Sequence, residues 1–217
     1  MSAEFRLNGK SVVVDAGPDF RQQMLQNQIG RLEALLLTHE HNDHVAGLDD
    51  LRPFCFKQEC SIDVFGLPRV LSEIKKRYAY AFSDNPYPGV PRLELKPIEV
   101  GVPLQIGAME FLPIPVMHGK LPIVGYRCGE VAYLTDVKTL PSEAYEMLQG
   151  VERLVISALH YNVHHSHLNL EEALHEIGKI GATKTVITHM SHRFKPTAEL
   201  VHELPDEVEV GVDGGWV

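Results

Sequence analysis

The sequence predicts a mixed α/β fold in which two β-sheets pack together with helices outside, a four-layer αββα sandwich. The chain has 217 residues, 44% of them hydrophobic and 23% charged, which suits one compact core. Apolar stretches of strand length alternate with helical patterns in two strand-rich halves. Because no linker, repeat or low-complexity segment divides the halves, we expect a single domain over residues 1–217.

The first half opens with a predicted hairpin. Residues 4–7 and 11–15 are rich in β-formers and flank Asn8-Gly9, a pair that favours a tight type I′ turn. Proline, glycine and the spacing of apolar residues delimit the elements that follow. These are a helix over 18–28, a buried strand over 34–38, a helix over 68–82 and a loop over 84–91.

The second half alternates more regularly between the two kinds of element. Short apolar runs rich in β-branched and aromatic residues predict strands over 94–100, 109–116, 123–128, 131–135, 153–157, 185–188 and 208–212. Helical periodicity predicts helices from residue 141 onward, over 170–180 and over 197–204.

Charge and composition exclude several classes of protein. Lys and Arg number 20 against 29 Asp and Glu, a formal net charge of −9, so the surface repels long nucleic acids unless it carries a basic stripe, and none is evident. No signal-peptide pattern opens the chain, and no apolar run approaches the ~20 residues that span a bilayer. The three cysteines form no C-x-x-C pair. We therefore expect a cytoplasmic protein with no membrane partner.

The twelve histidines are unevenly distributed, and the densest group is His39-Glu40-His41-Asn42-Asp43-His44. It directly follows the predicted buried strand over 34–38. Positions 39, 41 and 43 project to one side of an extended chain, and His44 follows as the chain turns toward a helix. Imidazole nitrogens and carboxylate oxygens are ligands for zinc, manganese or iron. A solvated histidine-rich loop is the alternative, but this spacing behind an apolar strand favours a metal site.

This motif resembles the H-x-H-x-D-H signature of the metallo-β-lactamase fold superfamily, and the resemblance covers nearly the whole chain. It implies the metallo-β-lactamase fold and two divalent metal ions, zinc or manganese, with iron as an alternative. The resemblance assigns His39, His41 and His118 to one ion, Asp43, His44 and His189 to the second, and Asp136 to a bridging position between them.

Three further segments resemble the phosphodiesterase family of phosphonate catabolism, which hydrolyses a cyclic ribosyl phosphate. They are residues 165–170, 188–192 and 210–214. In that family a histidine at the position of His167 contacts the phosphate or protonates the leaving group. The alternative is that His167 caps or covers the helix that starts near Asn169.

The function expected from this resemblance is hydrolysis of a small or cyclic phosphodiester by a metal-bridging hydroxide, which two divalent ions generate at neutral pH. Asp43, as a ligand carboxylate, and His167, as general acid, are the expected catalytic residues. Asp15 is expected to orient a ligand histidine. The expected partner is a small phosphodiester substrate, and we expect a homodimer.

Other readings of the same residues remain open. A thiolester or lactone hydrolase would use the same dimetal chemistry on a carbonyl carbon, and a non-catalytic metal-binding scaffold would keep the ligands alone. A tRNA 3′-end nuclease would need a basic substrate arm, and a two-iron redox protein would need a partner domain.

Two features of related chains are absent: a glycine-rich first strand and a cysteine cluster that binds structural zinc together with a histidine at the position of His192. The sequence starts at what resembles the second strand, as a natural short form or as a chain that lacks an N-terminal segment. His192 is therefore not predicted as a ligand. His160, His164 and His165 are expected to be surface or loop residues.

Overall fold

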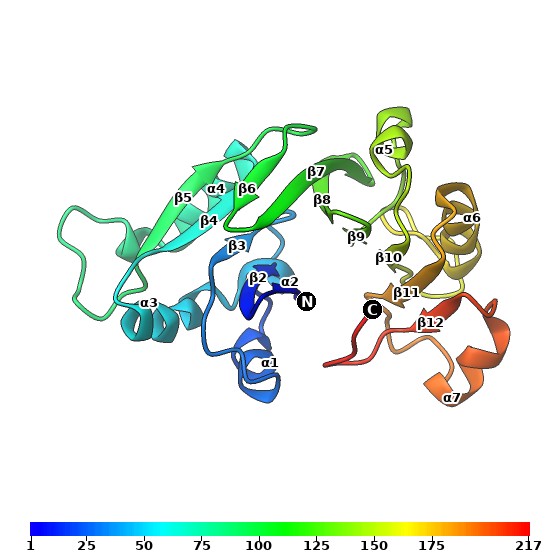
Figure 1. Ribbon diagram of the computed structural model, residues 1–217, viewed down its shortest axis with the longest axis horizontal. Coiled ribbons are helices and arrows are strands. Elements are labelled where there is room, and N and C mark those ends of the chain that lie inside the picture. The colour runs from blue at the N-terminus through cyan, green and yellow to red at the C-terminus, as the bar shows by residue number, and fades with distance from the viewer. The chain divides into compact units, whose positions relative to one another are not determined.

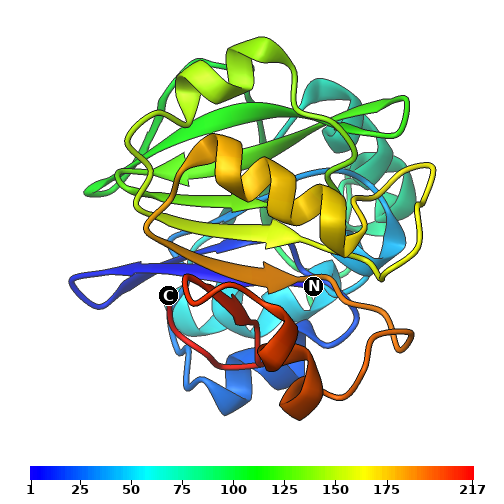
Figure 2. The ribbon, with the colours of Figure 1, turned by 90° about the vertical axis from the view of Figure 1, so that its right-hand side faces the viewer.

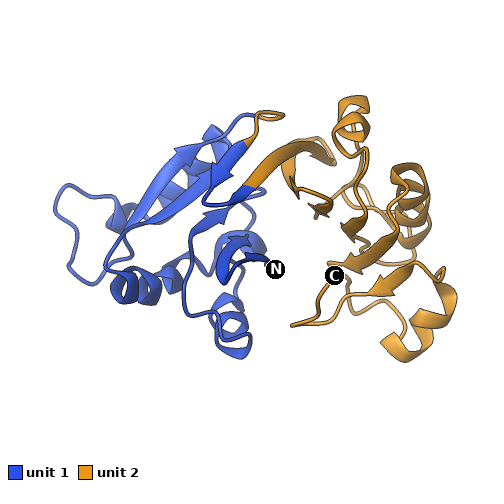
Figure 3. Cartoon of the chain, viewed as in Figure 1, with its two compact units in different colours: residues 1–99, 104–109 blue, residues 100–103, 110–217 orange.

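The computed structural model describes residues 1–217 and contains two compact units (Figure 3). Unit 1 comprises residues 1–99 and 104–109, and unit 2 comprises residues 100–103 and 110–217. Each unit contains a β-sheet and helices, so the expected mixed α/β class with two sheets is confirmed. The single domain over residues 1–217 remains a prediction.

Unit 1 contains a five-stranded sheet in the order β1-β2-β3-β4-β5 (Figure 1). The first two strands form the predicted antiparallel hairpin, and its turn has φ of 52° at Asn8 and 74° at Gly9, as a type I′ turn requires. The remaining neighbours are parallel. The strands are β1 (Ala3–Leu7), β2 (Lys10–Val14), β3 (Ala34–Leu36), β4 (Ile62–Gly66) and β5 (Leu93–Pro97).

The helices of unit 1 are short. They are α1 (Phe20–Gln26), α2 (Asn42–Val45), α3 (Arg52–Gln58) and α4 (Pro68–Arg77). The helix expected over 68–82 ends at Arg77 and is followed by a separate 3₁₀ turn, Ala79–Ala81. The segment 84–91 contains no helix or strand, as predicted. The apolar sides of the four helices pack against β2, β3 and β4. This core includes the fully buried Val13, Leu35 and Val64.

In unit 2 the strands follow the order β12-β11-β10-β9-β8-β7. Strands β9 to β12 are mutually parallel, and β7 and β8 continue antiparallel. The strands are β7 (Met109–His118), β8 (Leu121–Cys128), β9 (Val131–Leu134), β10 (Arg153–Ser157), β11 (Lys184–Thr188) and β12 (Val208–Val210). All of these were predicted, whereas β6 (Leu104–Ile106), which is grouped with unit 1, was not.

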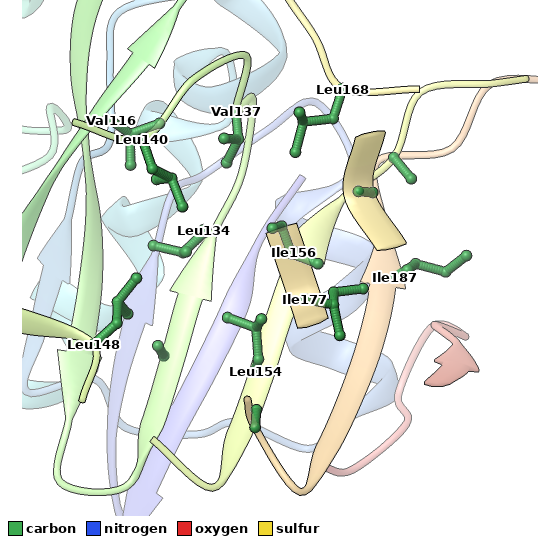
Figure 4. Close-up of a cluster of buried hydrophobic side chains, with 14 of the residues drawn as sticks. Val116, Leu134, Val137, Leu140, Leu148, Leu154, Ile156, Leu168, Ile177 and Ile187 are labelled. Carbon is green, nitrogen blue, oxygen red and sulfur yellow. The ribbon is translucent and has the colours of Figure 1, made fainter. Parts of the chain in front are cut away.

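The helices of unit 2 are α5 (Ser142–Met147), α6 (Leu170–Ile180) and α7 (Thr197–Leu200). Helix α6 has the predicted bounds because both ends are determined locally: Asn169 and Glu172 form a capping box, and Gly181 ends the helix at φ 74°. Helix α6 lies across the strands of unit 2 near β10 (Figure 2). Ile177 of α6 belongs to the same core cluster as Leu134 of β9 and Ile156 of β10 (Figure 4).

No helix of the structure is both long enough and apolar enough to cross a membrane.

Candidate metal centre

Unit 1 presents the histidine-rich motif directly after its central strand. Strand β3 pairs in parallel with β2 and β4, and its chain continues through the fully buried Thr38 and His39. His39 and His41 offer ring nitrogens within 4.8 Å of one another. Their rings meet at a centroid distance of 4.5 Å and an angle of 74°. The predicted ligands therefore emerge at the carboxyl end of a parallel strand, where α/β sheets commonly bind ligands.

Asp15 holds this motif from the end of the neighbouring strand β2. One carboxylate oxygen, Oδ1, accepts a hydrogen bond from the Thr38 backbone N–H at 2.9 Å. The other, Oδ2, accepts from the Thr38 hydroxyl at 2.8 Å and pairs with Nδ1 of His44 at 2.7 Å. All three residues are fully buried. Asp15 therefore contacts a histidine of the motif, and the role of that histidine as a metal ligand remains a prediction.

Close backbone approach also fixes the loop after Asp15 against α2. The Ala16 N–H donates to the His44 carbonyl at 2.8 Å. A Cβ atom on Gly17 would lie 2.3 Å from the Asp43 carbonyl oxygen. Only glycine therefore lets the two segments pass at this distance.

Asp43 and His44 lie on α2 and face one another. His44 is fully buried, the Asp43 side chain is 55% exposed, and Nε2 of His44 lies 3.3 Å from Oδ2 of Asp43. His44 donates its Nδ1 hydrogen to Asp15, so a neutral His44 ring would present a lone pair at Nε2 toward the acceptor-only carboxylate of Asp43. Two lone pairs at this distance repel unless a proton or a cation lies between them. The pair thus fits a metal ion.

Glu40, between the first two histidines, is engaged elsewhere. Its carboxylate forms an ion pair with Arg69, which lies in the first turn of α4. This contact explains why Glu40 is not part of the donor set.

In unit 2, Asp136 follows β9 and is 2% exposed. Oδ1 of its carboxylate accepts from the Thr135 hydroxyl at 2.8 Å and lies 3.2 Å from Nε2 of His189. Oδ2 lies 3.9 Å from Nε2 of His118. The structure therefore brings the three predicted ligands of this unit together, and each carboxylate oxygen faces a different histidine.

Backbone carbonyls fix the orientation of His118, the last residue of β7. Its Nδ1 lies 2.8 Å from the Ser166 carbonyl oxygen and 3.1 Å from that of Asp136. Carbonyl oxygens only accept, so Nδ1 carries the hydrogen and Nε2 presents its lone pair toward the Asp136 side. This is the tautomer that a metal ligand needs.

His167 packs between two of these histidines. Its ring centroid lies 4.5 Å from that of His118 and 5.2 Å from that of His189. Its Nδ1 is buried, has no hydrogen-bond partner and lies 3.9 Å from Oδ2 of Asp136. Desolvation lowers the pKa of His167 to about 4, and the Asp136 carboxylate opposes that shift. The N-cap of α6 is Asn169, so the reading of His167 as a helix cap is wrong.

The other histidines of the second half are placed as follows. His160 lies in the loop between β10 and α6, which fits the expectation of a surface or loop residue, but it is only 5% exposed, and its Nδ1 accepts from the Asn162 N–H at 3.1 Å. His165 is exposed, as expected, and His164 is half-buried with its ring 5.2 Å from that of His167. His192 is exposed.

Two of the predicted ligands and the supporting residue Asp15 share an unusual backbone conformation. Asp15, Asp136 and His189 have φ of 61°, 54° and 56°, and each follows the end of a strand. Asp and His tolerate this left-handed region better than most residues, and such positions concentrate at functional sites. A threonine directly precedes each of His39, Asp136 and His189. The sequence prediction missed the contacts that Thr38 and Thr135 make.

The chemistry of the donors fits divalent metal ions. The predicted ligands of the two units offer only imidazole nitrogens and carboxylate oxygens, and no cysteine is among them. Buried partners orient the nitrogens of His44 and His118. Such a donor set suits zinc, manganese or iron.

Comparison with known proteins agrees with this reading. A model of the beta-lactamase superfamily domain matches residues 10–190. The solved structure of a diphosphatase of the PhnP family superposes with a TM-score of 0.90 and 32% sequence identity, over 98% of this chain and 81% of that chain.

Two curated relatives match less of their own length. An octanoyltransferase from Porphyromonas gingivalis is 43% identical over 207 residues, which are 95% of this chain and 42% of the relative. A ribonuclease Z from Bradyrhizobium is 30% identical over 122 residues, 54% of this chain and 40% of the relative. The chain thus spans about two fifths of the length of these two proteins.

The family model covers most of the chain, and the solved diphosphatase covers nearly all of it, so the expected fold and family resemblance are confirmed. The chain belongs to the metallo-β-lactamase superfamily of metal-dependent hydrolases and is similar to the PhnP family.

Proposed function

We propose that this chain hydrolyses a small or cyclic phosphodiester with the help of two divalent metal ions, zinc or manganese. The observation that carries the proposal is the placement of Asp136, whose carboxylate oxygens face His189 and His118 separately. That placement suits a carboxylate shared by two ions. The similarity to a diphosphatase of the PhnP family supports phosphorus chemistry.

The proposed ligand sets follow the family pattern. His39, His41 and His118 would hold one ion, Asp43, His44 and His189 would hold the other, and Asp136 would contact both. Two such ions lower the pKa of a water molecule toward neutrality and stabilise negative charge on phosphoryl oxygens. A protein nucleophile such as serine or cysteine is then unnecessary.

His167 is the proposed proton donor to the leaving oxygen. Its buried position beside Asp136 keeps the ring neutral in the absence of ligand, because desolvation lowers its pKa to about 4. A phosphodiester anion beside the ring favours the protonated form, as any neighbouring negative charge does. Bound substrate would therefore favour uptake of a proton from solvent by His167, which would then donate it to the leaving oxygen.

Charge favours a small substrate over a long one. The net charge of −9 disfavours binding of a long nucleic acid, with its many phosphates, at the protein surface. Two divalent ions would concentrate positive charge at one place inside this acidic protein, and the carboxylates of Asp43 and Asp136 would offset only part of it. A single phosphodiester monoanion matches that local charge.

A second candidate is hydrolysis of an acyl thiolester. It is favoured by the octanoyltransferase that is 43% identical to this chain, since octanoyl transfer is acyl chemistry. The same proposed ions would polarise a carbonyl in place of a phosphoryl group.

The experiment that separates these candidates uses the chain reconstituted with zinc or manganese. We expect metal-dependent turnover of bis(p-nitrophenyl) phosphate and of a cyclic ribosyl phosphate, and little turnover of an octanoyl thiolester. Turnover of the thiolester alone would support the second candidate. Full metal content without turnover of any of the three would support a binding scaffold. The homodimer and the cytoplasmic location also remain predictions, and light scattering checks the former.

A further inference from the structure

We propose that Thr38 is a positioning residue that fixes the tautomer of His39 by relaying a hydrogen bond from Asp15. The proposal deepens the metal site described above and rests on the proposed role of His39 as a ligand. The sequence prediction and the family resemblance assign no role to Thr38.

The direction of the relay follows from which atoms can donate. Oγ1 of Thr38 lies 2.8 Å from Oδ2 of Asp15. A carboxylate only accepts, so the threonine hydroxyl must donate its single hydrogen to Asp15. Oγ1 of Thr38 also lies 3.0 Å from Nδ1 of His39. With its hydrogen already used, the hydroxyl oxygen can only accept there, and His39 must carry its hydrogen on Nδ1.

The resulting tautomer is the one that leaves the metal-binding nitrogen free of hydrogen. With the hydrogen on Nδ1, the lone pair of His39 lies on Nε2, on the side of the ring away from Thr38. A neutral histidine side chain free in water favours the opposite form, with the hydrogen on Nε2. The relay therefore reverses an intrinsic preference, which is the usual task of a partner to a metal-bound histidine.

Burial makes the relay strong. Asp15, Thr38 and His39 are all fully buried, so water does not compete for these hydrogen bonds, and each is stronger than at the surface. The same Oδ2 atom of Asp15 pairs with His44 at 2.7 Å. One carboxylate oxygen thus orients two histidines, His44 directly and His39 through Thr38, and their rings lie 4.2 Å apart.

The test uses the full chain without metal, labelled with ¹⁵N at histidine, and the His39 signal assigned with His39→Gln. We expect the wild type and Thr38→Ser to hold the hydrogen on Nδ1, because both keep the hydroxyl. Thr38→Val keeps the branched shape without the hydroxyl, and we expect its His39 to shift to the form with hydrogen on Nε2. Zinc affinity, measured by competition with a chelator, should fall about 10- to 100-fold in Thr38→Val and stay near the wild-type value in Thr38→Ser.

Two outcomes would overturn the proposal. One is a His39 that keeps its hydrogen on Nδ1 in Thr38→Val. The other is equal loss of zinc affinity in Thr38→Ser and Thr38→Val, which would make packing the cause. If Thr38→Val does not fold, Thr38→Ser and Thr38→Ala form a second pair that differs only in the hydroxyl. The tautomer is read in metal-free protein, so its result stands even if the chain fails to hydrolyse phosphodiesters.

Discussion

Oδ1 of Asp136 lies 3.2 Å from Nε2 of His189, the residue that follows strand β11. The carboxylate follows β9, and β10 lies between the two strands in the parallel sheet. Both residues have left-handed backbone conformations, with φ of 54° and 56°, which turn their side chains toward one another at the ends of their strands. The pair therefore depends on the sheet and not on local sequence.

Replacement of Asp136 by asparagine should remove metal from both proposed positions. The amide keeps the shape of the side chain but loses the charge and one acceptor oxygen. We expect metal content to fall well below two ions per chain. Loss of a residue that only supports a ligand lowers metal affinity by about 10- to 100-fold, and we expect Asp136→Asn to lower it further. Elemental analysis after dialysis checks this. Two ions bound as tightly as in the wild type would contradict the bridging role.

Metal binding should stabilise the folded chain. An ion present at one hundred times its Kd adds about 2.7 kcal/mol to the free energy of unfolding, which corresponds to an increase of about 5–10 °C in Tm for a chain of this length. Thermal unfolding with zinc and with a chelator measures the change. Asp136→Asn is the matched control, and we expect its Tm to respond much less to zinc.

Replacement of His167 by alanine should lower turnover with metal content retained. Loss of a proton donor lowers the rate of the chemical step by about 10²- to 10⁴-fold. The loss should be larger for an alkyl phosphodiester than for a p-nitrophenyl diester, because p-nitrophenolate leaves without a proton. His175→Ala is the matched control, since His175 is exposed on α6. Equal losses on both diesters would argue against proton donation.

Asp15→Asn should move the ring hydrogen of two histidines, His39 and His44, from Nδ1 to Nε2. The Thr38 N–H donates to Oδ1, so the amide oxygen must occupy that position and the NH₂ group must take the place of Oδ2. It would then donate toward Thr38 and His44, and both His39 and His44 would carry hydrogen on Nε2. We expect weaker zinc binding with unchanged far-UV circular dichroism. The control is Asp63→Asn, which loses only the partly exposed ion pair to Lys96.

The capping box of α6 gives a stability prediction that depends on pH. Partial burial opposes ionisation of Glu172, but hydrogen bonds from Lys138 and from the Asn169 N–H keep its pKa below the usual 4.5. The ionised form therefore stabilises the fold above pH 4.5, and this contribution is lost as the pH falls through the folded-state pKa. Glu172→Gln keeps the box but should cost about 0.2 to 1 kcal/mol at pH 7.

Chemical denaturation of the wild type and Glu172→Gln at several pH values measures this difference. The two free energies of unfolding should converge below pH 4.5. A constant difference down to pH 3 would show that the charge of Glu172 is not its cause. Asn169→Ala, which removes the cap itself, should cost about 1 kcal/mol over the whole range.

Much of the fold follows from local signals in the sequence. The hairpin at Asn8-Gly9 and helix α6 were predicted because turn and capping residues mark their ends. The sequence analysis missed helix α3, which has no side-chain cap to mark its start, and strand β4. The first helix ends at Gln26, earlier than expected, and is followed by a left-handed Gln28 at φ 54°.

The candidate site was predictable where residue type and spacing carry the signal. The group at 39–44 predicts metal ligands by itself, whereas His118, Asp136 and His189 were placed through a family resemblance. The relay from Asp15 through Thr38 to His39 was not predictable, because it joins two strands through tertiary hydrogen bonds. The burial of His160 was also missed, since it depends on the packing of unit 2 around residues 158–170.

Anomalous scattering from a crystal, recorded at the zinc, iron and manganese edges, tests the central proposal most directly. We predict two peaks about 3.5–4 Å apart, with Asp136 in contact with both and His189 in contact with one. A single peak, or two peaks that do not share Asp136, would contradict a centre with two metal ions in this chain.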